Sequence, residues 1–299
     1  MGAWGEVKNC PVLFEFKVIV FGWNGVFFVL PSYSVLMSVY DKETAANLSK
    51  SLMSIATQTY PPKEIVLVCD GALTQGLEET IQAFRQQYTD LLQLVRIESN
   101  VGLGEALNQG LQHCQNEYVA RMDSDDIALP ERIEQQLYLM LKKPLDICGC
   151  NIVEFQDENI DVCIKQVPSS HSEILKYAKK RNPFNHPSVV FRKTVILDAG
   201  GYQAMPYFED YYLWVRALQR GARCGNLPQV LLRMRSNAAF YNRRGGIGYA
   251  RHVVAFWKQL AKIGFITRLE AYVTIIPRLL SAIVPNQLRI QIYRHLLRS

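Results

Sequence analysis

An acidic cluster in the first half of the chain is the most direct sign of chemistry. Asp123, Asp125 and Asp126 fall within four residues, directly after an apolar run at 118–122. Carboxylates at this spacing repel one another. A hard divalent cation relieves that repulsion, because Mg²⁺ and Mn²⁺ prefer oxygen ligands and often bridge carboxylates to substrate phosphates. The pattern therefore indicates a metal site, and the alternative is a solvated turn in which Asp126 caps the next helix.

Two further polar residues follow apolar runs. Asp70 ends the run that begins at residue 64, and it precedes Gly71, a pair that also forms ordinary turns. Asn100 opens the loop Asn-Val-Gly-Leu-Gly, but Leu107 stands where a dinucleotide fingerprint has its third glycine. A dinucleotide site is therefore a poor interpretation. Two other interpretations of residues 100–104 remain: an ordinary tight turn, or a turn that a bound nucleotide approaches closely.

A second acidic pair begins a helical stretch later in the chain. Acids such as Glu209 and Asp210 are favoured at a helix N-terminus by the helix dipole, so capping is one interpretation. The apolar spacing of Leu213 and Trp214 indicates that this helix packs on the body, which would hold a carboxylate at the rim of a pocket. A carboxylate there could take a proton from a hydroxyl. His186 precedes a short strand, and a lone histidine is more often structural than catalytic.

The elements that must position these residues alternate regularly. This alternation predicts an α/β fold with a parallel sheet and helices on both faces. In such sheets ligands bind beyond the carboxyl ends of the strands, where the polar residues above collect. After residue 143 the alternation fades. Strands are expected at 34–39, 64–69, 92–97, 118–122, 145–153, 162–167, 188–191 and 230–234, and helices at 44–58, 77–88, 104–114, 130–141, 172–180 and 208–220.

Composition excludes several other classes of protein. The chain has 299 residues, of which 49% are apolar and 20% charged, so it can bury a sizeable core as one large domain, or as one domain with an extension. It has no apolar run of the ~18–20 residues that a spanning helix needs, which excludes a polytopic membrane protein. The seven cysteines form no CxxC pair, which argues against a zinc ribbon or a disulfide framework and favours a reducing compartment.

The charge is unevenly distributed. Residues 1–215 contain 18 Lys+Arg and 26 Asp+Glu, a net charge of −8. Residues 216–299 contain 15 Lys+Arg and one acid, Glu270, a net charge of +14. A basic tail behind an acidic body is expected to meet an anionic partner. Its helical spacing and aliphatic content predict a basic amphipathic region at 236–299 that lies on an anionic membrane surface, with packing against the body as the alternative.

The first 32 residues form an apolar extension. The stretch from Val18 to Leu30 is broken by Gly22, Asn24 and Gly25. A signal peptide is one interpretation. The preferred interpretation is an extension that lies on a membrane or is disordered, because the chemistry of the segment that follows is typical of the cytosol.

Five ordered stretches together resemble a known family. The chain resembles family 2 glycosyltransferases of the GT-A fold, and most of all the bacterial members that build capsule, exopolysaccharide and O-antigen. The resemblance covers residues 33–235 and implies a Rossmann-like mixed sheet with helices on both faces, followed by the basic helical extension. The stretches are SVLMSVY, CDG, NVGLGEALNQGL, YVARMDSDDIALPERIEQQ and FEDYYLWVRALQRG.

The resemblance implies an inverting transfer from a nucleotide-diphosphate sugar to a hydroxyl of a saccharide or a polyprenyl-linked saccharide, with Mn²⁺ or Mg²⁺. By position, Asp125 and Asp123 match the DxD motif: Asp125 should hold the metal, and Asp123 should lie near it and the donor ribose or sugar. Asp210 matches the general base. The remaining matches are Ser38, Tyr40, Asp70 and Asn100 at the donor, and Glu209 and His186 at the acceptor or sugar.

Three positions depart from the family pattern. Cys69 stands where many members have an additional Asp, and Asp41 stands where Asn is frequent. Many relatives also have a His after the last sheet strand as a further metal ligand, and here that region reads Arg233-Met-Arg235. A cation cannot ligate the metal. Two interpretations remain: Arg235 neutralises the leaving diphosphate, or the metal has fewer protein ligands.

Other functions fit the sequence less well. A sugar-phosphate nucleotidyltransferase would need a glycine-rich basic loop after its first strand, and that turn has no glycine here. A catalytically silent membrane-associated scaffold would not need Asp70, Asp123, Asp125 and Asp210 together. The GxSxG motif of serine hydrolases and the GxxxxGK[ST] motif of P-loop NTPases do not occur, so both of these classes are poor interpretations. The basic tail suits a lipid surface better than nucleic acid, so no nucleic-acid partner is expected, and the protein is expected on the cytoplasmic face of the plasma membrane.

Overall fold

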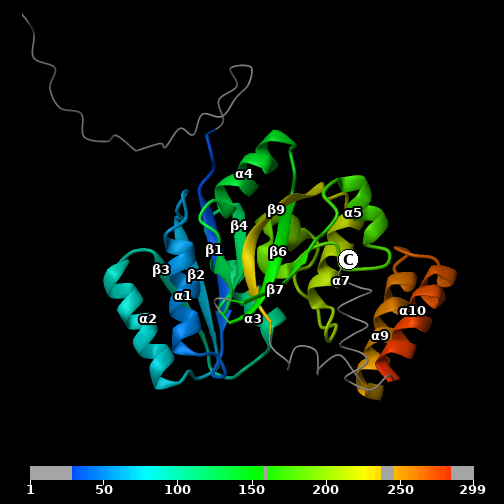
Figure 1. The fold of residues 1–299 in the computed structure, drawn as a ribbon, viewed down its shortest axis with the longest axis horizontal. Helices are drawn as coiled ribbons and strands as arrows, with labels where there is room; N and C mark the ends of the chain where they lie inside the picture. Colours follow the sequence, from blue (N-terminus) through cyan, green and yellow to red (C-terminus); the bar gives the residue numbers. More distant parts are fainter. Residues whose placement is uncertain (1–28, 158–159, 237–245, 284–299) are drawn as a thin grey trace, which may run out of the picture.

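The computed structural model describes residues 29–157, 160–236 and 246–283 (Figure 1). Most of the 1–32 extension, the start of the 236–299 region and its last residues lie outside this description. The strands are β1 (Tyr33–Val39), β2 (Glu64–Asp70), β3 (Leu92–Ile97), β4 (Tyr118–Asp123), β5 (Ile127–Ala128), β6 (Ile147–Asp157), β7 (Ile160–Lys165), β8 (Val190–Arg192) and β9 (Cys224–Arg235). The helices are α1 (Ala45–Ala56), α2 (Gln75–Gln87), α3 (Leu103–His113), α4 (Arg132–Lys142), α5 (His171–Tyr177), α6 (Lys193–Asp198), α7 (Glu209–Gln219), α9 (Gly246–Lys262) and α10 (Arg268–Ile283), and His186–Ser188 forms a short 3₁₀ turn.

The first half of the chain forms the parallel part of the sheet. The strand order is β3-β2-β1-β4, and each neighbouring pair runs parallel. Strands β1 and β2 are buried almost throughout, as expected for parallel strands covered on both faces. The carboxyl ends of β1, β2 and β4 therefore meet at one edge of the sheet, called here the carboxyl edge, and the register places Ser38 opposite Asp123.

The second half of the chain extends the same sheet with mixed pairing. Strand β8 runs antiparallel to β4 and to β6, while β6 pairs in parallel with β9. The far end of β9 pairs with the short β5, which directly follows the acidic cluster. Strand β7 pairs only with β6 among the described strands. The long β9 thus brings Arg235 back to the carboxyl edge.

Helices cover both faces of the sheet. Along β1, Val35 and Met37 point to a core that is shared with α1, α2 and α4, while Leu36 points to a core shared with α3, α5, α6 and α7. Helix α3 lies very close to the sheet, because a Cβ at Gly110 would come within 2.5 Å of side-chain atoms of Leu36 and Val68. The predicted mixed sheet with helices on both faces is confirmed (Figure 1).

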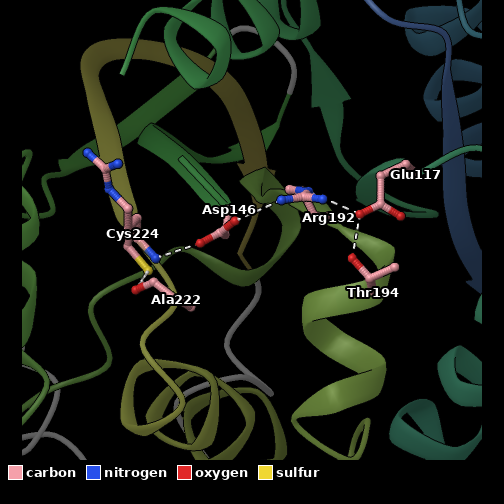
Figure 2. A network of polar contacts seen from close by, with 7 residues as sticks. Glu117, Asp146, Arg192, Thr194, Ala222 and Cys224 are labelled. Atoms are coloured by element: carbon pink, nitrogen blue, oxygen red, sulfur yellow. Dashed lines mark hydrogen bonds and ion pairs between the residues drawn. The ribbon is translucent and has the colours of Figure 1, made fainter. Parts of the chain in front are cut away.

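A polar network ties the strands together at the edge opposite the acidic cluster (Figure 2). Arg192 lies 3.0 Å from Glu117, which precedes β4, and 3.4 Å from Asp146, which precedes β6. Thr194 donates to Glu117, and the backbone N–H of Arg223 donates to Asp146 over 2.8 Å. Such part-exposed ion pairs contribute little stability each, so the network mainly positions the starts of β4, β6 and β9 relative to the end of β8.

The first helix of the basic tail packs on the body. Val253, Phe256, Trp257 and Leu260 of α9 are buried in a third apolar cluster with residues of α7, among them Tyr211, Tyr212 and Val215. The apolar face of α9 is therefore used within the protein, which is the alternative to a membrane-facing helix. Among the described helices, none combines the length and apolar character needed to cross a bilayer.

Most of the expected elements are confirmed, and their ends differ from the expected bounds in several places, for example at α5, which ends at Tyr177 rather than at residue 180. Helix α4 begins at Arg132 rather than at Pro130, and β9 extends over Cys224–Arg235 rather than only 230–234. Two elements were not expected, β5 and α6. Both are short: their two and six residues are too few for a periodic pattern, and β5 depends on a partner strand about a hundred positions away.

Candidate active site

The acidic cluster lies at the carboxyl end of β4. Asp123 is the last residue of the strand, and carboxylate oxygens of Asp123, Asp125 and Asp126 all lie within 4.8 Å of one another. Asp126 is buried, and one of its oxygens accepts the backbone N–H of Arg235 over 2.8 Å. Its other oxygen is also buried and has no hydrogen-bond partner among the described atoms. Asp126 is therefore bonded to β9 and is not the cap of helix α4.

Electrostatics in the cluster favour a cation. Burial, followed by the negative charges of Asp123 and Glu43, raises the pKa of Asp125 from 3.8 to about 7. Burial, followed by the negative charges of Asp123 and Asp125, raises the pKa of Asp126 well above its usual range. A site of hard oxygen donors, with one buried oxygen unpartnered in the described structure, has the chemistry that Mg²⁺ or Mn²⁺ requires. The residues present therefore fit the expected divalent metal.

Arg121 is a site residue that sequence reasoning missed. Its side chain is 1% exposed and forms an ion pair with Asp123. A buried charge needs a partner, so the ion pair with Arg121 fixes the position of the Asp123 carboxylate within the cluster. An arginine two residues before the cluster, inside an otherwise apolar strand, was the signal that could have revealed it, because arginine is rarely fully buried.

Asp70 and Asn100 meet at the end of β2. The Asp70 carboxylate is buried and accepts the backbone N–H groups of Val101 at 2.7 Å and Gly102 at 3.1 Å. Asn100 in turn donates to the Asp70 carbonyl over 3.3 Å. The turn needs Gly71, because its φ is +90° and a Cβ there would lie 3.1 Å from the backbone nitrogen of Asn100. Asp70 thus holds the loop in place, and its two oxygens keep further lone pairs for a ligand.

Ser38 and Tyr40 belong to the end of β1. Ser38 is half-buried beside Asp123, and Tyr40 directly follows the strand with 40% of its surface exposed. The structure therefore places both at the carboxyl edge with Asp70 and Asp123. Their contact with a donor stays a prediction.

The second acidic pair forms the first turn of α7. Asn182 donates its side-chain N–H to the Asp210 carboxylate over 2.6 Å, which orients that group. Burial and the nearby Asp210 charge raise the pKa of Glu209. The Glu209 side chain lies beside the start of α3, since a Cβ at Gly104 would come within 3.7 Å of it.

Tyr202 links the two acidic sites. Its hydroxyl lies 2.8 Å from Nε2 of His186. Burial raises the pKa of Tyr202, and the charges of Asp210 and Asp123 raise it further, so both carboxylates lie within electrostatic reach of this hydroxyl. Asn108 fixes the Tyr202 backbone by accepting its N–H at 2.7 Å and donating to its carbonyl at 2.8 Å.

His186 is packed against the rings of Tyr202 and Trp214. Its ring lies edge-on to Trp214 at 6.1 Å, and burial together with the charge of Arg121 lowers its pKa well below the usual value. A neutral, hydrogen-bonded ring of this kind stabilises the packing of Tyr202 and Trp214, in agreement with a structural role for a lone histidine. A contact with acceptor or sugar stays a prediction.

Arg235 lies beside the acidic cluster at the end of β9. Its guanidinium stacks on the Phe155 ring at 4.6 Å, and its Nε donates to the Asp125 carbonyl over 3.3 Å. The arginine occupies the position where relatives were expected to have a histidine, and it adds positive charge next to the carboxylates.

Together, the mixed sheet and the helices on both of its faces define the GT-A fold. A family model for glycosyl transferase family 2 matches residues 34–198, which is more than half of the chain. The chain belongs to glycosyl transferase family 2 and is a glycosyltransferase.

Similar proteins of known name support this assignment. The chain is 42% identical over 240 residues to an amylovoran biosynthesis glycosyltransferase of Erwinia amylovora, covering 78% of this chain and 88% of the relative. It is 38% identical over 273 residues to a UDP-Gal:α-D-GlcNAc-diphosphoundecaprenol β-1,3-galactosyltransferase of Escherichia coli, covering 90% of this chain and 97% of the relative.

Solved structures share the fold at low sequence identity. The structure of S. aureus TarS 1–349 in complex with UDP-GlcNAc matches with a TM-score of 0.65 and 15% identity, over 88% of this chain and 75% of that chain. The mannosyltransferase PcManGT of Pyrobaculum calidifontis, in complex with GDP-Man and Mn²⁺, matches with a TM-score of 0.62 and 19% identity, over 87% and 72%.

Proposed function

We propose that this glycosyltransferase inverts the anomeric carbon while it transfers a sugar from a nucleotide-diphosphate donor to a hydroxyl of a lipid-linked saccharide, with a divalent metal. The observation that carries the proposal is the carboxylate cluster Asp123, Asp125 and Asp126 at the carboxyl edge of the parallel strands. Ligands of open α/β sheets bind beyond this edge. The named relatives support assembly of cell-surface polysaccharide as the pathway.

The donor side of the site is formed by the carboxyl edge. Asp125 and Asp123 would hold Mn²⁺ or Mg²⁺, which supplies positive charge for the diphosphate that leaves. Arg235 adds a fixed positive charge beside them. Asp70 and Asn100 shape the loop against which the nucleoside would lie, and Ser38 in β1 and Tyr40 just after β1 lie at the same edge of the sheet.

The acceptor side is formed by the start of α7. Asp210 accepts a proton from the attacking hydroxyl, and Asn182 keeps that carboxylate oriented. Glu209 lies next to it, where it can contact the acceptor or the transferred sugar. Direct displacement requires attack from the side opposite the leaving diphosphate, so a base on α7, an element separate from β4, suits inversion.

The test of this proposal is a transfer assay. The probe acceptor is GlcNAc-α-diphosphate that carries a short alkyl chain, and the donors are UDP-galactose, UDP-GlcNAc and GDP-mannose, each with Mn²⁺ or with EDTA. We expect turnover of one of these donors that requires the metal. Turnover that is equal with EDTA would contradict the metal site, and no turnover of any donor would support a silent scaffold instead.

We further propose that α10 attaches the protein to an anionic membrane surface on the cytoplasmic side. The α10 side chains Leu269, Tyr272, Val273 and Ile276 are each more than half exposed, and their spacing places them on one face of the helix. The net charge of +14 in residues 216–299 complements anionic lipid. A lipid-linked acceptor would also require such a location.

Vesicle binding tests the α10 face. We expect Val273→Glu to weaken sedimentation with phosphatidylglycerol-containing vesicles about tenfold or more, because the substitution puts a charge into the apolar face. Leu197→Glu, an exposed apolar residue of α6, is the matched control. A substitution tests the α10 face better than removal of the whole tail from about residue 242, because loss of α9 would expose the apolar residues of α7. Equal binding of both variants and the original protein would contradict the proposal.

A further inference from the structure

Tyr207 has a strained backbone and an exposed ring next to the proposed base. Its φ is +72°, a conformation that costs energy for any residue with a Cβ, and 44% of its surface is exposed. Such strain persists only where the surrounding structure enforces it, and it is common at functional sites. Tyr207 lies three residues before Asp210, so its conformation places an aromatic ring at the entrance to α7.

Two side chains of α9 extend this aromatic surface. The Tyr207 ring lies edge-on to Tyr249 at 5.3 Å and at 5.4 Å from the ring of His252. Tyr249 and His252 are both half-buried, three positions apart on one face of α9. We call Tyr207, Tyr249 and His252 the aromatic shelf. It joins the loop before α7 to a helix that lies outside the segment matched by the family model.

The aromatic shelf rests on a rigid base. Phe208 stacks on Phe256 with ring centres 4.4 Å apart and planes 8° from parallel, and Phe256 also packs on Tyr211 at 4.8 Å. Phe256 is fully buried. These contacts lock the first turn of α7 to α9, so the rings of the shelf are held at a fixed position relative to Glu209 and Asp210.

The aromatic shelf also borders the acidic pair. Tyr207 and Phe208 directly precede Glu209, and the stack of Phe208 on Phe256 holds this turn against α9. A group bound on the shelf would therefore lie beside Glu209, on the side of the molecule formed by α7 and α9. The donor residues, by contrast, lie at the ends of β1, β2 and β4.

We propose that the aromatic shelf binds the saccharide ring of the acceptor. One face of a pyranose presents C–H groups that pack on aromatic rings, while tyrosine hydroxyls and a histidine nitrogen can hydrogen-bond its hydroxyls. The acceptor hydroxyl must reach Asp210 to lose its proton, and Tyr207 of the shelf lies three residues before Asp210 in the chain. This inference rests on the proposed function and assigns the acceptor-recognition role to α9.

The transfer assay with the alkyl GlcNAc-diphosphate probe tests the aromatic shelf. We expect Tyr249→Ala and His252→Ala each to raise the acceptor KM about tenfold, the effect of losing one well-packed ring contact, while the KM of the donor changes less than twofold. Tyr249→Phe should restore most of the affinity, because it keeps the ring. His113→Ala, an exposed histidine at the opposite end of α3 from Gly104, is the matched control and should leave both constants unchanged.

Separate outcomes test the aromatic shelf and the proposed function. An unchanged acceptor KM in Tyr249→Ala and His252→Ala would overturn the shelf while the transfer reaction stands. An equal rise in donor and acceptor KM would also overturn it, because it would indicate general damage to the site. A wild-type chain that transfers no sugar to the probe with Mn²⁺ would contradict the proposed function on which the shelf depends.

Discussion

Asp210→Asn is expected to reduce turnover by about 10²–10⁴-fold, the usual contribution of a positioned general base. The amide keeps the shape of the carboxylate and can still hydrogen-bond Asn182, but it cannot accept a proton from the acceptor hydroxyl. Donor binding should be nearly intact, because the donor residues lie on other elements. Steady-state kinetics measure the loss, and thermal stabilisation by the nucleoside diphosphate with Mn²⁺ measures donor binding.

Two comparisons make the Asp210 result specific. Asp198→Asn removes an exposed carboxylate at the end of α6 and should leave turnover unchanged. Glu209→Gln should raise KM more than it lowers turnover, since Glu209 is proposed to contact substrate. If Asp210→Asn instead weakened donor binding and kept its turnover, Asp210 would belong to the donor site and another group would be the base.

Asp125→Asn is expected to reduce transfer by roughly 10³-fold, because a bound cation contributes several kcal/mol of charge stabilisation in such reactions. The substitution removes one negative charge and one carboxylate oxygen from the cluster of Asp123, Asp125 and Asp126. Stabilisation of the folded protein by Mn²⁺ should disappear together with activity. Calorimetric titration with Mn²⁺ and the transfer assay measure the two effects.

The same substitution should not destabilise the metal-free fold. The pKa of Asp125 is raised from 3.8 to about 7 in the folded protein, so charging this group costs stability as the pH rises from about 4 to about 7. Above that range Asp125→Asn removes the cost, and the metal-free variant should melt at the same temperature as the original protein or higher. A variant that kept most of its Mn²⁺-dependent activity would contradict the assignment.

Local sequence patterns were enough to predict that polar residues gather at the carboxyl edge of the parallel strands. The apolar runs that became β1, β2 and β4 are long, and each is followed by a polar residue, so the parallel-sheet rule placed Ser38, Asp70 and Asp123 together. Asp123, Asp125 and Asp126 were recognisable because three acids so close together are costly without a cation.

The partners of these residues could not be predicted in the same way. Asn182 contacts Asp210 across 28 positions, and Arg235 contacts Asp126 across 109, so no local spacing indicates either pair. The tail shows the same limit. Its helical periodicity predicted apolar faces, but only the fold decides that α9 packs on α7 while a face of α10 remains exposed.

The stereochemistry of the product tests the central claim most directly. The transfer assay with an α-linked donor and Mn²⁺ gives a product whose anomeric configuration proton NMR reads from the coupling of the anomeric proton. A single displacement assisted by Asp210 predicts a β-linked sugar, formed with Mn²⁺ and not with EDTA. An α-linked product would contradict direct displacement at this site.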